Sequence, residues 1–382
     1  MRMKKERFRI LSLFANIGVA EAYLEKLGHH VAVANELDYR RVLIYKSIYK
    51  STNMICGDIT DANIYNSVID AAKKAKVDFI MATPPCQGMS TAGKLAKNDI
   101  RNILFQHAVN SIKDLNPKYF LLENVPAFMT TSIQDGDKSA LIPDLIRESL
   151  QDKYHLIFNV INTQHYDIPQ SRERMILLGT RKDMKKLWEM PKASGKIITM
   201  EDAIGKLPSL DPYIRDISKE EFDTLFPDFE IKRSNGLAIS PWHFPPTHIY
   251  SNVIAMQHTP TGRSAFQNID LFKPRKKNGV IIKGFGNTYK RQNWDTPSYT
   301  IAMSNNQIST QNSVHPGHYI GKDCNGYDIY SDARVLTIYE LMRLMSIPDD
   351  WPLPLSTNKS FLRHVIGEGV PSLLIKKLFQ NI

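Results

Sequence analysis

The chain carries a cysteine, a glutamate and two arginines directly beside apolar runs of strand length. Cys86 follows two prolines after the run at residues 78–82, and Glu123 follows the run at residues 119–122. Two arginines precede a third run, at residues 175–178. Short apolar runs of this kind predict buried strands, and ligands of open α/β sheets bind where such strands end. We therefore expect a thiol, a carboxyl group and two guanidinium groups to form one site at the edge of a sheet.

The N-terminal half of the chain alternates short apolar runs with segments of helical periodicity. The predicted strands lie at residues 8–14, 31–34, 54–56, 78–82, 119–122, 156–161 and 175–178. Helical spacing predicts helices over residues 20–27 (ended by Gly28), 42–49, 336–345 and 371–379. Such alternation is typical of an α/β fold with a doubly wound, mostly parallel sheet.

The regular alternation is lost in the second half. Pro, Gly, Asn and Ser interrupt the chain from residue 186 onward, which predicts a second, smaller and irregular domain over residues 186–330. We expect a catalytic and cofactor-binding domain over residues 1–185, completed by residues 355–382. Residues 331–354 are then a hinge region between the two domains.

The composition of the 382 residues is that of a globular protein, with 42% hydrophobic and 9% aromatic residues. No stretch approaches the roughly 20 apolar residues that span a bilayer, and the charged N-terminus leads into a strand rather than a signal peptide. Cys56, Cys86 and Cys324 are too widely spaced for a disulfide framework or a zinc site. We expect a cytoplasmic protein that binds neither a metal nor a membrane.

The formal net charge of +10 is concentrated in one segment. Residues 231–299 contain ten Lys or Arg against two Asp, interleaved with aromatic side chains. A basic run can be an ordinary solvated face, but this mixture favours contacts with the phosphates and bases of a nucleic acid. We assign phosphate contacts to Arg275, Lys276 and Lys277.

Polar residues and a glycine-bearing turn follow the first three predicted strands. The turn at residues 14–18 precedes the first helix, where a backbone can approach a ligand and free N–H groups are available. Glu36 follows the second strand, where nucleotide-binding sheets hydrogen-bond a ribose. Asp58 follows the third strand and can accept a hydrogen bond from an adenine amine. These positions predict a site for an adenine nucleoside.

Four motifs, in one order, resemble those of the C5-cytosine-specific DNA methyltransferases of bacterial restriction–modification systems. They are PCQ at residues 85–87, ENV at 123–125, QSRER at 170–174 and GEGVP at 367–371. The resemblance covers residues 8–180 and 330–382 and implies a Rossmann-like methyltransferase core. It further implies the cofactor S-adenosyl-L-methionine, its product S-adenosyl-L-homocysteine, and a target-recognition domain over residues 186–330.

The resemblance implies a role for each polar residue of the first site. The thiolate of Cys86 attacks C6 of a flipped-out cytosine, because C5 alone is too weak a nucleophile to take a methyl group. Glu123 relieves the negative charge at N3, and Asn124 positions the ring. Arg174 donates to the cytosine O2 and orients Glu123, while Arg172 lies near the thiol.

Cofactor contacts also follow from the resemblance. The implied cofactor-binding residues are Phe14, Asn16, Gly18, Glu36, Leu37, Asp58, Ile59, Pro85, Leu104, Glu368 and Val370. In the family's motif D-L-F-A-G-x-G-G, this chain has Ser12 for the Asp and Asn16 and Val19 for two glycines. Glu368 stands where the family usually has Asn. Because Asn adopts left-handed backbone angles more readily than most residues, we expect Asn16 to be tolerated.

The segment after Cys86 is small, polar and cationic. It is either an ordinary surface loop or, as the resemblance implies, a loop that closes over double-stranded DNA. In the second case Ser90, Lys94 and Arg101 contact phosphates. We further expect a monomer, with a cognate restriction endonuclease as a partner in the same system.

Three alternatives remain at this stage. A tRNA cytosine-C5 methyltransferase shares the catalytic motifs, but it carries a further Cys-Phe-Thr signature, and this chain has no cysteine between Cys86 and Cys324. A catalytically inert DNA-binding protein would explain Asn16, Val19 and Glu368 but not the retained catalytic residues. A nicotinamide oxidoreductase is disfavoured, because no G-x-G-x-x-G follows the first strand.

Overall fold

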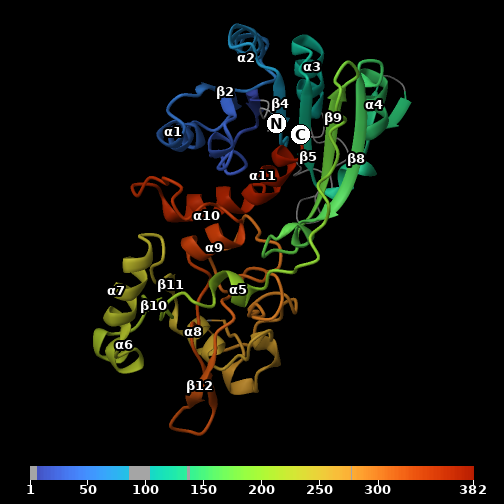
Figure 1. Cartoon of the computed structure of the whole chain (residues 1–382). Coiled ribbons are helices and arrows are strands. Elements are labelled where there is room, and N and C mark those ends of the chain that lie inside the picture. Colours follow the sequence, from blue (N-terminus) through green and yellow to red (C-terminus); the bar gives the residue numbers. More distant parts are fainter. Residues whose placement is uncertain (1–6, 86–103, 136–137, 277) are drawn as a thin grey trace.

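The computed structural model describes residues 7–85, 104–135, 138–276 and 278–382. Its centre is a seven-stranded sheet (Figure 1). The strands are β1 (Arg9–Leu13), β2 (His30–Glu36), β3 (Asn53–Cys56), β4 (Phe79–Ala82), β5 (Tyr119–Asn124), β8 (Tyr154–Asn162) and β9 (Glu173–Arg181). Their order across the sheet is β3-β2-β1-β4-β5-β9-β8, and only β9 runs antiparallel to its neighbours. The predicted mostly parallel α/β sheet is confirmed.

The direction of strand order reverses at the centre of the sheet. From β1 the chain proceeds outward to β2 and β3, and it then returns to place β4 on the other side of β1. The connections on the two sides of β1 therefore diverge above its carboxyl end. Open α/β sheets bind their ligands in the crevice at such a reversal.

Apolar residues on both faces of the sheet are covered by helices. Neighbouring residues along one strand enter different cores, as Phe79 and Ile80 of β4 do, because successive side chains point to opposite faces. One core includes side chains of α1 (Tyr39–Ile48) and α11 (Ser372–Gln380). The other core contains side chains of α2 (Ala62–Lys74), α3 (Phe105–Leu115) and α4 (Ile142–Leu150). The C-terminal helix thus completes the fold that the N-terminal strands begin.

The α-helix predicted over residues 20–27 is wrong. This stretch consists of turns and one short 3₁₀ helix, η1 (Glu25–Leu27). The two carbonyls just before this stretch accept hydrogen bonds from distant side chains: Tyr49 Oη donates to Gly18 O at 2.6 Å, and Ser372 Oγ donates to Val19 O at 2.7 Å. Apolar spacing alone cannot reveal such tertiary competition for the backbone.

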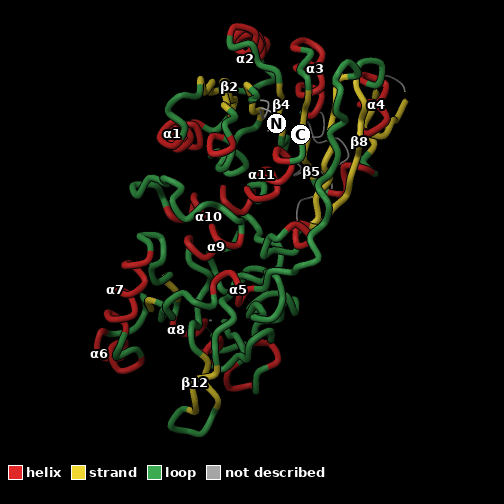
Figure 2. The backbone as a smooth tube through the Cα atoms, viewed as in Figure 1, coloured by secondary structure: helices red, strands yellow, loops and turns green. Residues whose placement is uncertain are grey.

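The second half of the chain has few regular elements (Figure 2). Its helices are α5 (Met200–Ile204), α6 (Lys219–Leu225), α7 (Phe229–Ile239), α8 (Tyr250–Gln257), α9 (Ile338–Leu344) and α10 (Lys359–Glu368). Its paired strands are β10 (Tyr213–Ile214) with β11 (Thr247–His248), and β12 (Tyr319–Lys322) with β13 (Asp328–Tyr330). A remaining pair, β6 (Ser132–Asp135) with β7 (Lys138–Leu141), belongs to the first half.

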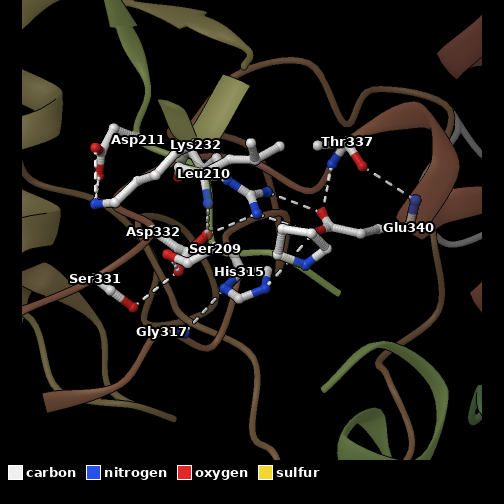
Figure 3. A network of polar contacts seen from close by, with 12 residues as sticks. Ser209, Leu210, Asp211, Lys232, His315, Gly317, Ser331, Asp332, Thr337 and Glu340 are labelled. Atoms are coloured by element: carbon white, nitrogen blue, oxygen red, sulfur yellow. Dashed lines mark hydrogen bonds and ion pairs between the residues drawn. The ribbon is translucent and has the colours of Figure 1, made fainter. Parts of the chain in front are cut away.

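A buried network of ion pairs and hydrogen bonds lies at the start of α9 (Figure 3). The guanidinium group of Arg334 contacts Asp332 at 2.7 Å and Glu340 through two bonds of 2.9 Å. Its remaining donors reach the carbonyls of Leu210 and Val335, at 3.0 and 3.1 Å. Burying a charge is costly unless its donors and acceptors are satisfied, and in this cluster all five N–H donors of Arg334 have acceptors.

Two neutral histidines flank the network. The Nδ1 atom of His315 accepts from the backbone N–H of Gly317 at 3.1 Å, and the Nε2 atom of His248 accepts from Val335 N at 3.2 Å. A protonated ring could not accept either bond. Burial lowers the pKa of His315 to about 4 and that of His248 to about 3.

These histidines predict a pH-dependent free energy of unfolding. The unfolded chain takes up a proton near pH 6.5, whereas folded His315 stays neutral to about pH 4, so stability is lost as the pH falls through this window. We expect His315→Gln to reduce the slope of unfolding free energy against pH by up to about 1.4 kcal/mol per pH unit. Urea titrations between pH 6.5 and 4 measure this slope. His155→Gln, at an exposed position, is the control, and equal slopes for the wild type and His315→Gln would contradict the assignment.

Candidate active site

The carboxyl ends of β1, β4 and β5 are tied together by side chains. Thr83, just after β4, donates from Oγ1 to Phe14 O at 3.1 Å, which joins the ends of β4 and β1. Asn124, the last residue of β5, donates from Nδ2 to Pro84 O at 3.2 Å and accepts from Val125 N at 2.9 Å. The backbone that leads into Cys86 is therefore fastened to the end of β5. Cys86 itself lies outside the described residues.

Glu123 and Arg174 form a buried ion pair beside this tether. Arg174 Nε lies 2.8 Å from Glu123 Oε1, and the two side chains are only 13% and 9% exposed. They meet because β9 runs antiparallel to β5, which brings the start of β9 to the carboxyl end of β5. Burial raises the pKa of Glu123, and the positive charges of Arg174 and then Arg172 oppose this rise only in part. The carboxyl group can therefore hold a proton closer to neutral pH than an exposed glutamate can.

Arg172 donates hydrogen bonds to the backbone of two other segments. Its guanidinium group donates to Ile301 O at 3.0 Å, to Gly367 O at 3.1 Å and to Gly369 O at 3.2 Å. It thereby joins the start of β9 to the C-terminal end of α10. The predicted proximity of Arg172 to the thiol stays a prediction, since Cys86 is outside the described residues.

The loop after β1 has the backbone shape that a cofactor site needs. Phe14, Asn16 and Gly18 have positive φ angles of 58°, 52° and 83°. Asn16 thus occupies a left-handed position, as expected from its tolerance for such angles. Its backbone N–H donates to Glu36 Oε2 at 2.9 Å, and its Nδ2 donates to Val365 O at 2.9 Å. The loop is held between the end of β2 and helix α10.

Gly18 is required by close packing as well as by its φ angle. A Cβ atom there would lie 2.1 Å from Cε2 of Tyr49, whose hydroxyl group also binds the Gly18 carbonyl. Tyr49 was not among the predicted site residues. Its position at the end of α1 gives no sequence signal for this contact.

The group at the end of β2 fits a nucleoside. Glu36 is buried, and its two oxygens accept one backbone N–H each, from Asn16 and from Asp38, so lone pairs remain for further donors. Leu37, the next residue, leaves its side chain 65% exposed. Asn16 Oδ1 is buried and has no hydrogen-bond partner among the described residues. Free acceptors beside an exposed apolar side chain suit ribose hydroxyls and an adenine ring.

The other predicted cofactor residues lie around the same strand ends. Asp58, after β3, is exposed and accepts from Thr60 N at 2.9 Å, while Ile59 is buried. Pro85 and Leu104 are half-buried, and Val370 lies in the core beneath α11. Glu368 instead forms an ion pair with Arg41 of α1.

The predicted DNA contacts are described only in part. Ser90, Lys94, Arg101 and Lys277 lie outside the described residues. Arg275 is exposed, and its guanidinium group donates to Gly279 O at 2.8 Å and Asp270 O at 2.7 Å, so it stabilises its own loop. Lys276 is exposed. Within the described ranges, no cluster of His, Cys, Asp and Glu could hold a metal ion, and no helix is long and apolar enough to cross a membrane.

Sheet order, strand-end site and motif order together define a methyltransferase. The chain belongs to the C-5 cytosine-specific DNA methylase family, whose model matches residues 8–382. It is 37% identical over 383 residues to Type II methyltransferase M1.HgaI of Avibacterium volantium, covering 99% of each chain. Identity to Type II methyltransferase M.XorII of Xanthomonas oryzae pv. oryzae is 25% over 382 residues, covering 96% of this chain and 82% of that protein. The protein is a DNA (cytosine-5) methyltransferase.

Solved structures share the fold at lower identity. A DNMT2 variant from Spodoptera frugiperda superposes with a TM-score of 0.59 at 17% identity, covering 97% of this chain and 99% of that one. EhMeth, a methyltransferase of Entamoeba histolytica, gives a TM-score of 0.58 at 14% identity, covering 99% and 98%. At these identities the likeness concerns the fold alone.

Proposed function

We propose that the protein transfers a methyl group from S-adenosyl-L-methionine to C5 of a cytosine flipped out of double-stranded DNA, through a covalent bond between Cys86 and C6. The observation that carries this proposal is the buried Glu123–Arg174 pair next to the tethered segment that leads into Cys86. A carboxyl group with a raised pKa and a nucleophile entering from the neighbouring strand suit addition to a pyrimidine ring.

The chemistry begins with the thiolate of Cys86. Its sulfur forms a bond to C6, and the electron pair of the C5–C6 double bond moves onto C5. Protonated Glu123 donates its proton or a hydrogen bond to N3, which relieves the charge that builds up in the ring. After C5 has accepted the methyl group, the C5 proton is removed by a base, the C5–C6 double bond re-forms and the thiolate leaves. Arg174 holds the carboxyl group of Glu123 toward the ring throughout.

The target base has to leave the helix for this reaction. Attack on C6 requires access to the face of the ring, which stacking in a duplex hides. The chain reaches Cys86 shortly after β4, beside the sheet reversal, and in this proposal the base enters the crevice there. The unstacking cost is a few kcal/mol, which contacts to the DNA backbone can offset.

The residues around β1 and β2 would hold the cofactor. When bound, S-adenosyl-L-methionine supplies an electrophilic methyl group carried on a sulfonium. Glu36 would accept from the ribose hydroxyls with its free lone pairs, while Phe14 and Leu37 would pack on the adenine. Asp58 would accept from the adenine amine at the end of β3.

The biological setting follows from the relatives. Both curated relatives named above are Type II methyltransferases, and we propose that this chain likewise modifies a specific DNA sequence within a restriction–modification system, beside a cognate endonuclease. Residues 186–330 then form the target-recognition domain, whose basic segment carries exposed Lys276. The enzyme acts as a monomer in this proposal.

Trapping the covalent bond tests the proposal directly. With a fluorine in place of hydrogen at C5 of the target cytosine, the final elimination cannot occur, so the Cys86–C6 adduct persists. We expect the wild-type enzyme, cofactor and a duplex containing 5-fluorocytosine to give a protein–DNA band on a denaturing gel. Cys86→Ala should give none, whereas Cys324→Ala, at an exposed cysteine, should give the wild-type amount. An adduct with Cys86→Ala would exclude this nucleophile, and an adduct with a tRNA but not with DNA would change the substrate.

Glu123 and Arg174 predict a pH effect on kcat. Glu123 must be protonated to act, so kcat falls as the pH rises through its pKa. Because the charge of Arg174 favours the ionised form, Arg174→Met should raise that pKa and move the alkaline limb of the kcat profile to higher pH, while kcat itself falls by about 10- to 100-fold. Arg147→Met, at an exposed position on α4, serves as control. A limb that stays in place or moves to lower pH would rule out the proton-donating role.

A further inference from the structure

The turn at the C-terminal end of α10, residues 367–369, packs between two other segments. A Cβ atom on Gly367 would lie 2.4 Å from Ala302 O, and one on Gly369 would lie 3.0 Å from side-chain atoms of Val19. Between these two glycines stands Glu368, the last residue of α10. The backbone is therefore closely packed on both sides of Glu368.

Arg172 fixes the same turn from the sheet. It donates to the carbonyls of Gly367 and Gly369, one on each side of Glu368. The carboxylate of Glu368 is thereby held on the side of α1. Its side chain is only 16% exposed, so a charge there needs a partner.

Arg41 provides that partner from the first turn of α1. Its guanidinium group lies 2.7 Å from Glu368 Oε2, and the Arg41 side chain is 21% exposed. His364, one turn earlier on α10, lies 3.4 Å from the other carboxylate oxygen. The ion pair between Arg41 and Glu368 joins α1 to the C-terminal end of α10. Helix α1 starts three residues after Glu36, so the pair lies close in sequence to the end of β2.

We infer that Arg41 is a positioning residue of the cofactor site. By neutralising Glu368, it holds the turn against α1 and keeps an uncompensated negative charge out of the wall that the ends of β2 and α10 form. Arg41 is needed for this because two other acidic residues precede α1. Glu36 is buried, and Asp38 is already paired with Arg40. The inference rests on the proposed cofactor site, and it explains how this chain accommodates a glutamate between the two glycines.

The inference predicts that loss of Arg41 is harmful because it leaves Glu368 charged. Arg41→Met should weaken binding of S-adenosyl-L-homocysteine and raise the KM for S-adenosyl-L-methionine by about tenfold, as for a partly buried pair that loses one partner. The kcat value at saturating cofactor should change by less than about threefold, since Arg41 touches no reacting group. Arg41→Met/Glu368→Gln should recover the affinity to within about threefold of Glu368→Gln alone.

Calorimetry with S-adenosyl-L-homocysteine, steady-state kinetics and thermal unfolding of the four proteins test this coupling. Lys26→Met removes a cation from the exposed pair with Asp350 and should leave the cofactor affinity unchanged. Equal losses in Arg41→Met and in the double variant would overturn the inference, as would a loss confined to kcat. If the wild-type protein binds no cofactor at all, the proposed function fails rather than the role of Arg41.

Discussion

The side chain of Arg172 joins three segments that are far apart in the sequence. From the start of β9 it donates to carbonyls at Ile301, Gly367 and Gly369, and it is 3% exposed. Charged donors form stronger hydrogen bonds than neutral ones, and a buried guanidinium that lost these acceptors would carry a large desolvation cost. Arg172 therefore helps to fix the end of α10, which forms one wall of the proposed cofactor site. The same chain direction places Arg174, two residues later, against Glu123.

Two buried glutamates show how the number of contacts decides the direction of a pKa shift. Glu340 accepts two bonds from Arg334 and one from the backbone N–H of Thr337, and its pKa is lowered to about 2. Glu123 has one close contact with Arg174, and burial raises its pKa instead. Desolvation is large in both places, but only the first site has enough donors to exceed it. The first arrangement suits a permanent structural charge, and the second suits a group that exchanges protons.

The sequence predicted the sheet because strand and helix periodicity are local properties. The contact between Glu123 and Arg174 was also predictable. Glu123 follows one apolar run and Arg174 precedes another, and residues at the ends of neighbouring strands commonly form one site. The contacts of Arg172 were not, because carbonyl acceptors leave no trace in the residue types. The prediction of a helix over residues 20–27 failed for the same reason, because the carbonyl of Gly18 accepts a hydrogen bond from the hydroxyl group of Tyr49, just after α1. The ion pair between Arg41 and Glu368 joins segments that are far apart in the sequence, and nothing in the two residue types predicts that they pair with each other.

Methyl transfer to a natural substrate is the measurement that tests the proposed reaction most directly. Genomic DNA that lacks cytosine methylation would be incubated with the enzyme and S-adenosyl-L-methionine carrying a labelled methyl group, and the product would be analysed by bisulfite sequencing. We expect label at C5 of cytosine within one short sequence motif. Label on adenine or on N4 of cytosine, or transfer to RNA but not to DNA, would contradict it.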